Sequence, residues 1–356
     1  MVSPVGKFNK SPWGWRPSKI PWYGNLSGLV SAWHGSAALG LDAAALRHRL
    51  TEAVESREDW LLHPCLTALT LQEEREGHLQ RDFQLATWIA AHSQEPLGSV
   101  HVPEPLWLWS LDGGGPVSPG KYDLQDLGRT ISQSQWPCPI SLDVFGHSIG
   151  VQYPDTWSAQ EPLHEKQQQQ LQHEVLFFLR AMHVAKSILS DFEKWAASVT
   201  RVVVPFYSKG GGGVFHSSSN ATIPGLIFCD LFYGEVQILE ALAHESSHLH
   251  FFLAEAAGPL VDQRHNGLYE SPLRADTRPL RGIFLAYHAL AHICAFYVDL
   301  LNVNVDSTGY SEKELKTLRA KLNDAEHILN SNQHLLTDLG VEFFSLTKEV
   351  ACHGSP

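Results

Sequence analysis

The sequence predicts an α+β fold with a largely helical N-terminal region and a C-terminal metal domain, in which a small sheet flanks one long helix. Three observations predict it. In residues 37–92, apolar side chains recur every three and four positions, which is the spacing of an amphipathic helix. Two short β-type runs occupy residues 200–206 (TRVVVPF) and 224–230 (PGLIFCD). The second run leads into an apolar helix that contains the segment HESSH.

Changes in composition divide the 356 residues into three parts. Residues 1–36 are rich in Pro, Gly and Trp, and we expect an irregular arm that packs through its aromatic rings. Residues 37–199 form a helical and mixed region, in which short apolar runs predict strands over 98–153 and a long helix follows over about 159–199. Residues 200–356 form the metal-binding domain.

Composition and charge exclude several classes of protein. The 44% of hydrophobic residues and 18% of charged residues are ordinary for a globular protein. A net charge of −12 opposes any general affinity for nucleic acids or anionic membranes, because their phosphates would be repelled. The five cysteines are odd in number and form no CxxC pair, which is typical of a reducing compartment. Without a signal-peptide or membrane-spanning run, the chain is expected in the cytoplasm.

The segment HESSH has the spacing of a metal site. His244 and His248 are four residues apart, so on a helix their imidazoles lie on one face and can bind one ion. Glu245 follows the first histidine, where it is a candidate general base or an orienting group. The surrounding helix is apolar, and burying three polar side chains there would be costly without a function. The structural alternative is a pair of core histidines satisfied by hydrogen bonds.

A third metal ligand is expected from the next apolar helix, residues 282–301. His288 and His292 are again four apart on it. We favour His288 and keep His292 in reserve, while the alternative is that both merely pack in the core. The metzincin class is excluded, because Phe251 and Ala254 stand where its motif requires Gly and His.

Arginines are dense between the two histidine helices. The stretch YESPLRADTRPLRG carries Arg274, Arg278 and Arg281. The planar guanidinium group matches a carboxylate, so an arginine beside the metal would bind a carboxylate cosubstrate. The alternative is solvated surface charge, paired with Asp276 or Glu270.

Together, the segments PGLIF, HESSH and YESPLRADTRPLRG resemble the HExxH-motif proteins found beside ribosomally synthesised peptide natural products, which include 2-oxoglutarate-dependent peptide hydroxylases. The resemblance covers residues 223–297, and SPLRxDxRPLxG is its specific part. It implies a mononuclear iron(II) centre on His244, His248 and a later histidine, with 2-oxoglutarate as cosubstrate. It also implies hydroxylation of a side-chain carbon, often Cβ, in a precursor peptide. Glu245 matches the acid of the motif, and the three arginines fall in the matching basic stretch.

Two other classes use the same residues. In a zinc peptidase of the thermolysin-like kind, the two histidines bind zinc and Glu245 activates a water molecule. The usual third ligand of that class is a glutamate in an NExxxD arrangement, which the following helix lacks. A structural metal site would usually recruit cysteine and four protein ligands. In either enzyme class, the sheet and the HESSH helix are expected to form a zincin-like domain.

Overall fold

The fold is described from a computed structural model of the chain. The residues that it describes are 13, 43–56, 86–87, 89–90, 93, 97–103, 106–109, 114–127, 141–142, 149–151, 165–205, 217–221, 223–230, 234–304, 306 and 309–353. Most of the arm predicted over 1–36 therefore lies outside the described residues. Within them, the fold is mostly helical with small sheets, which confirms the α+β prediction at that level.

The central element is helix α8, Glu235–Glu255, which contains the HESSH segment as predicted. It has no Gly or Pro inside it, and its apolar residues include the fully buried Leu242. The helix ends before Gly258, which has a φ of 154°, and before Pro259, which cannot continue it. The motif therefore lies in the middle of a long, well-defined helix.

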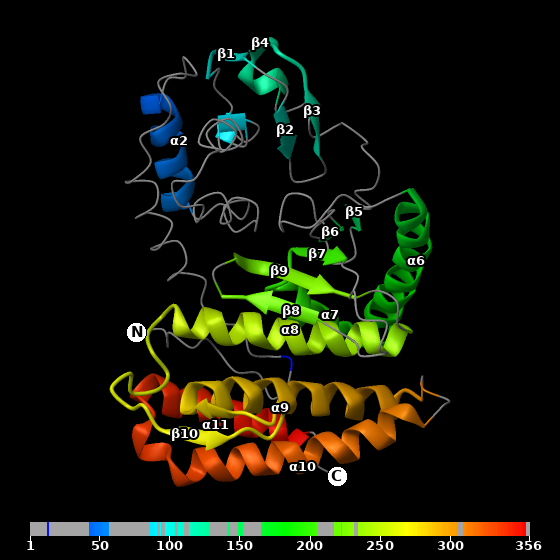
Figure 1. The fold of residues 1–356 in the computed structure, drawn as a ribbon, viewed down its shortest axis with the longest axis vertical. Helices are drawn as coiled ribbons and strands as arrows, with labels where there is room; N and C mark the ends of the chain where they lie inside the picture. Colours follow the sequence, from blue (N-terminus) through cyan, green and yellow to red (C-terminus); the bar gives the residue numbers. More distant parts are fainter. Residues whose placement is uncertain are drawn as a thin grey trace.

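A five-stranded sheet covers one side of α8, as Figure 1 shows. Its strands, in spatial order, are β5 (Ser141–Leu142), β6 (Ile149–Val151), β7 (Val202–Pro205), β9 (Ile223–Cys229) and β8 (Ser217–Asn220). The three central strands are parallel and both edge strands are antiparallel. The two predicted β-type runs form the neighbours β7 and β9, where the buried Val203 pairs with the buried Ile227. The predicted sheet beside the motif helix is confirmed.

On its other side, α8 packs against a layer of helices (Figure 1). This layer contains α9 (Leu280–Asn302), α10 (Tyr310–Ser331) and α11 (Asp338–His353). An antiparallel hairpin, β10 (Leu268–Glu270) and β11 (Thr277–Pro279), leads directly into α9. Because the last residue of α8, Glu255, pairs with Arg281 in the first turn of α9, the two helices run antiparallel.

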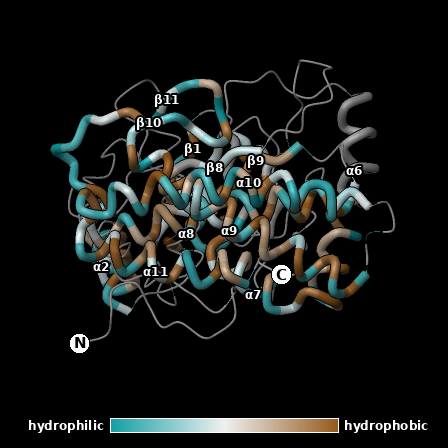
Figure 2. The backbone as a smooth tube through the Cα atoms, turned by 90° about the horizontal axis from the view of Figure 1, so that it is seen from below, coloured by the Kyte–Doolittle hydropathy of each residue, from teal (hydrophilic) through white to brown (hydrophobic). Residues whose placement is uncertain are grey.

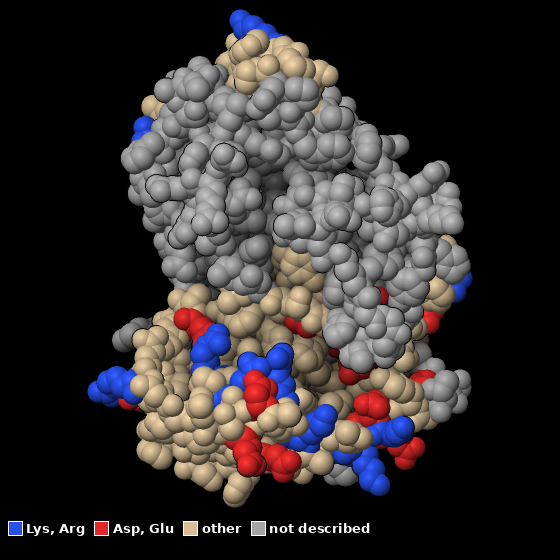
Figure 3. All heavy atoms as spheres, viewed as in Figure 1, with Lys and Arg blue, Asp and Glu red and all other residues tan. Residues whose placement is uncertain are grey.

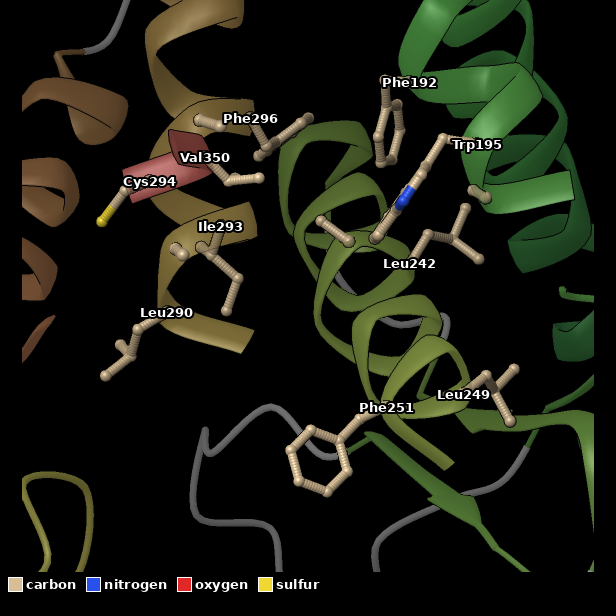
Figure 4. Packing of buried hydrophobic residues seen from close by; sticks show 14 of the residues in the cluster. Phe192, Trp195, Leu242, Leu249, Phe251, Leu290, Ile293, Cys294, Phe296 and Val350 are labelled. Atoms are coloured by element: carbon tan, nitrogen blue, oxygen red, sulfur yellow. The ribbon is translucent and has the colours of Figure 1, made fainter. Parts of the chain in front are cut away.

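Two helices stand where the sequence predicts one over 159–199. These are α6 (Glu165–Ile188) and α7 (Ser190–Ala197), separated at Leu189, which has non-helical backbone angles of −117° and 45°. In Figure 4, Phe192 and Trp195 point from α7 toward α8 and α9. Both helices, which precede residue 200, therefore pack against α8.

Trp13 of the N-terminal arm is part of the same core. Only 4% of it is exposed, and its ring centroid lies 5.1 Å from that of Phe192 and 5.0 Å from that of Trp195. Its indole Nε1 donates a 2.6 Å hydrogen bond to Oδ2 of Asp299 on α9. This is the aromatic packing that the sequence predicts for the arm.

Helix α9 is long and apolar enough to cross a membrane by length and composition alone, but 78% of its most apolar window is buried inside the protein. Three helices, α8, α10 and α11, pack around it. Figure 2 shows hydrophobic stretches along α8 and α9, which lie in the middle of the view. Most of this helix therefore lies in the core of the protein.

The remaining elements lie apart from α8 and its sheet in Figure 1. They are α2 (Ala43–Ser56), the antiparallel pair β1 (Ser99–Val102) and β4 (Gly120–Asp123), and the antiparallel pair β2 (Leu106–Trp109) and β3 (Gly114–Val117). The strands predicted over 98–153 are present as β1 to β6.

Candidate metal centre

His244 and His248 converge on one point beside α8. Their Nε2 atoms lie 2.9 Å apart, and their rings are nearly perpendicular, at 86°. Two imidazoles bound to one ion at about 2.0–2.1 Å each would place their nitrogens roughly 3 Å apart. The helical spacing therefore already gives the two ligand atoms the separation that a single metal ion requires.

His248 is held in the neutral form that binds metals. Burial, together with the positive charges of His244, Arg274 and Arg281, keeps its pKa well below the usual value for histidine. A neutral imidazole offers a lone pair to a metal without first losing a proton. Its Nδ1 is buried and has no hydrogen-bond partner among the described residues, so no protein group there fixes its tautomer.

Glu245 is bound to the edge of the sheet. Its carboxylate is 2% exposed and accepts two hydrogen bonds of 2.7 Å, one on each oxygen, from the hydroxyls of Ser217 and Ser219. The two serines are two residues apart on β8, so their side chains lie on the same face of the strand. Neither serine belongs to a recognisable sequence motif, and the run SSSN gives no sign that they would contact Glu245.

A second, partly buried carboxylate lies one helical turn before His244. Glu240 accepts hydrogen bonds on Oε2 from the hydroxyls of Tyr297, at 2.7 Å, and Tyr310, at 3.5 Å. Burial raises its pKa, and the charge of His244 partly opposes that rise. Glu240, His244 and His248 therefore form one stripe along α8. Glu240 could not be found from the sequence, because the two tyrosines that contact it lie 57 and 70 positions away.

The three predicted arginines have different surroundings. Arg281 donates from Nε to Oε1 of Glu255 at 2.6 Å, and Arg278 forms a 2.9 Å ion pair with Asp276. Arg274, on the exposed turn of the hairpin, has no carboxylate partner among the described residues. Figure 3 shows basic and acidic side chains interspersed over this lower part of the molecule. Arg274 is the predicted arginine best placed to bind an added carboxylate near His248.

His288 lies inside the helical layer at the level of His248. His248 is seven residues before Glu255, and His288 is seven residues after Arg281, so the Glu255–Arg281 contact aligns them across the antiparallel helices. His288 is 2% exposed, and its Nδ1 lies 3.1 Å from the hydroxyl of Thr347 on α11. Burial and the charges of other histidines, including His248, lower its pKa.

His292 packs in the core. Its ring stacks on Trp195 with centroids 4.6 Å apart, and its Nδ1 is 2.9 Å from the backbone carbonyl oxygen of His288. Trp195 also stacks on His250, at 4.5 Å. Among the described residues, no three His, Cys, Asp or Glu side chains form a group able to hold a metal. The structure thus brings His244 and His248 together and adds neither His288 nor His292 to them.

Comparison with known proteins adds no relative to this description. No model of a known protein family matches the chain, and no curated protein matches its sequence. The candidate centre is therefore defined by its own residues. These are the converging histidine pair, the carboxylate that β8 holds beside it, and an unpaired arginine on the adjacent hairpin.

Proposed function

We propose that the protein is an iron(II)- and 2-oxoglutarate-dependent dioxygenase that hydroxylates a side-chain carbon, by resemblance Cβ, of a residue in a ribosomally made precursor peptide. The observation that carries the proposal is the 2.9 Å separation of Nε2 in His244 and His248. We place the enzyme in the cytoplasm, where the free thiols of Cys229, Cys294 and Cys352 would stay reduced.

The residues beside the pair suit this chemistry. His244 and His248 would hold the metal, which when bound supplies the oxidising chemistry that an unactivated carbon requires. Arg274 would bind the distal carboxylate of the 2-oxo acid through its planar guanidinium group. The sheet with its antiparallel edge strand next to the motif helix supports a zincin-like arrangement of this domain.

The surroundings of Glu245 favour a hydroxylase over a zinc peptidase. The general base of a peptidase must direct a carboxylate oxygen at the attacking water. Both oxygens of Glu245 instead accept hydrogen bonds from serines of β8, so each is already engaged by the strand. A hydroxylase needs no protein base for its oxidising step. Glu245 then serves as an anchor, and zinc-dependent peptide cleavage is the alternative function.

We propose His288 as the third protein ligand. Its level on α9 matches that of His248, and burial lowers its pKa, which favours the neutral ring that binds a metal. Since the described residues contain no three-residue metal group, binding would require the His288 ring to move toward the pair. His292 stays in reserve, because stacking on Trp195 holds its ring in the core.

The metal assignment is tested by anaerobic reconstitution with iron(II), followed by titration with 2-oxoglutarate and observation of the iron-to-ligand charge-transfer band. The wild-type protein should develop the band, and His244→Ala or His248→Ala should abolish it. His327→Ala is the matched control, because His327 is an exposed histidine of α10. A band that persists in both motif variants would remove the basis of the proposal.

Glu245→Gln separates the two enzyme classes. In a hydroxylase, the variant should keep measurable turnover, followed as succinate formation and a gain of about 16 Da on a candidate peptide, the mass of one oxygen atom. In a peptidase, the variant should lose nearly all activity while zinc stays bound. Peptide cleavage with zinc alone, no succinate and an inactive variant would establish the peptidase instead.

A further inference from the structure

The contact between β8 and the motif helix has a specific geometry. Ser217 and Ser219 lie on the face of β8 that meets α8, and each donates its hydroxyl to a different oxygen of Glu245. The side chain of Ser218, between them, is exposed. Two alternate residues of one strand therefore hold both oxygens of a single buried carboxylate. We call this pair, Ser217 and Ser219, the serine clamp.

We infer that Ser217 and Ser219 are positioning residues for the metal pair: by gripping Glu245, they fix the turn of α8 that carries His244 and His248 against the edge of the sheet. The inference rests on the proposed function only in requiring that the pair binds a metal. It assigns a role to two residues that neither the motif nor the resemblance includes.

The clamp is strong enough to hold the helix turn in place. Leaving a buried carboxylate without hydrogen bonds costs several kilocalories per mole, so Glu245, at 2% exposure, depends on its two donors. The 2.7 Å distances are typical of short, charge-assisted hydrogen bonds from a hydroxyl to a carboxylate. Such hydrogen bonds weaken quickly when donor and acceptor move apart, so they hold the carboxylate in a narrowly defined position.

The position of Glu245 controls the two ligands because all three share one turn and a half of helix. A roll of α8 about its axis would move both Nε2 atoms in the same sense. The next residue, Ser246, is also tied to the sheet side, through a 2.9 Å hydrogen bond to Thr200 just before β7. Two consecutive motif residues thus contact the strands, and the serine clamp is the contact nearer the metal pair.

The experiment measures metal binding in Ser217→Ala, Ser219→Ala and the double variant. Ser218→Ala is the matched control, being the same substitution on the same strand with its side chain outside the clamp. We expect iron(II) affinity to fall roughly 10- to 100-fold in the double variant, as typical for loss of groups that orient metal ligands. The charge-transfer band with 2-oxoglutarate should also shift. The rescue variant Ser217→Thr/Ser219→Thr keeps both hydroxyls and should have the affinity and the band of the wild type.

A double-mutant cycle with Glu245→Ala tests whether the serines act through Glu245. In that background the serine substitutions should cause no further loss of metal affinity, because the carboxylate that they hold is gone. Each single serine variant keeps one hydrogen bond, so the singles remain informative if the double variant does not fold by circular dichroism.

Two results would overturn the clamp while leaving the metal assignment intact. One is wild-type affinity and an unshifted band in both single variants. The other is an equal loss of affinity in the Glu245→Ala background. Failure of the proposed metal centre looks different, because then wild type and His244→Ala would bind iron equally and no variant would change the band. That outcome would overturn the positioning role as well.

Discussion

The hydroxyl of Thr347 accepts a hydrogen bond from Nδ1 of His288. Thr347 uses its one proton to donate to the backbone carbonyl of Phe343 at 2.9 Å, so at the 3.1 Å contact with His288 it must be the acceptor. Nδ1 of His288 therefore carries the proton, and the lone pair of the neutral ring is on Nε2. This is the tautomer in which a histidine can bind a metal through Nε2.

We accordingly predict that His288→Ala abolishes tight iron binding. Thr347→Val removes the hydroxyl at nearly constant volume and should weaken binding by about 10- to 100-fold, because the tautomer is no longer fixed. His292→Phe keeps an aromatic ring against Trp195 and serves as the control, with affinity close to wild type. Isothermal titration with iron(II) under anaerobic conditions gives the affinities. Full metal occupancy in both His288→Ala and His292→Ala would rule out the three-histidine site.

Arg274→Gln should weaken 2-oxoglutarate binding without changing iron affinity. Hydrogen bonds to a charged group are worth about 1.5–3 kcal/mol, which corresponds to roughly a 10- to 100-fold rise in the dissociation constant of the cosubstrate. Arg264→Gln is the matched control, because that exposed arginine is engaged by Asp262. Titration of the charge-transfer band gives the dissociation constant. Equal effects of the two substitutions would exclude a specific role for Arg274.

Gly340 should not tolerate a side chain. A Cβ at this position would overlap the backbone carbonyl oxygen of Leu260, and that backbone is held by the amide of Thr337 at 3.1 Å. We expect Gly340→Ala to lower the free energy of unfolding by at least about 2 kcal/mol. Gly282→Ala is the comparison: its Cβ would meet only the side chain of Arg278, at 3.3 Å, and should be neutral or stabilising within α9. Urea denaturation of both variants tests this difference.

Acid should destabilise the metal-free protein through the protonation of a buried histidine. Burial lowers the pKa of His292 to about 4 from 6.5. Between these pH values His292 is protonated in the unfolded chain but not in the folded protein. The free energy of unfolding therefore decreases as pH falls from about 6.5 to 4. For this residue alone, the decrease reaches about 3 kcal/mol. In His292→Phe the loss over this pH interval should be smaller by that amount, and an identical pH profile would contradict the assignment.

The elements beside the metal pair were predictable because their signals are local. The β7 and β9 runs are short, apolar and rich in β-branched residues, and α8 shows an uninterrupted helical pattern up to Gly258. The spacing of His244 and His248 likewise lies within one helix. The break between α6 and α7 at Leu189 contains no Gly or Pro, so the apolar spacing predicts one continuous helix there.

The rest of the candidate site depends on contacts between distant residues. Ser217 meets Glu245 across 28 positions of sequence, and Tyr297 meets Glu240 across 57. No sequence motif marks either contact, because the first depends on how the edge strand packs against α8 and the second on how α9 packs against it. The level of His288 likewise follows from the Glu255–Arg281 pairing, which no periodicity reveals.

The packing of Trp13 against α9 constrains the order in which the chain can fold during synthesis. The indole bonds to Asp299 across 286 positions, so the arm leaves the ribosome long before the helix that receives it exists. At about 5–20 residues per second, that interval is on the order of 15–60 s. During this time the ring cannot pack between α7 and α9, because α9 has not yet emerged from the ribosome. The contact between Trp13 and this core therefore forms late, after α9 has been made.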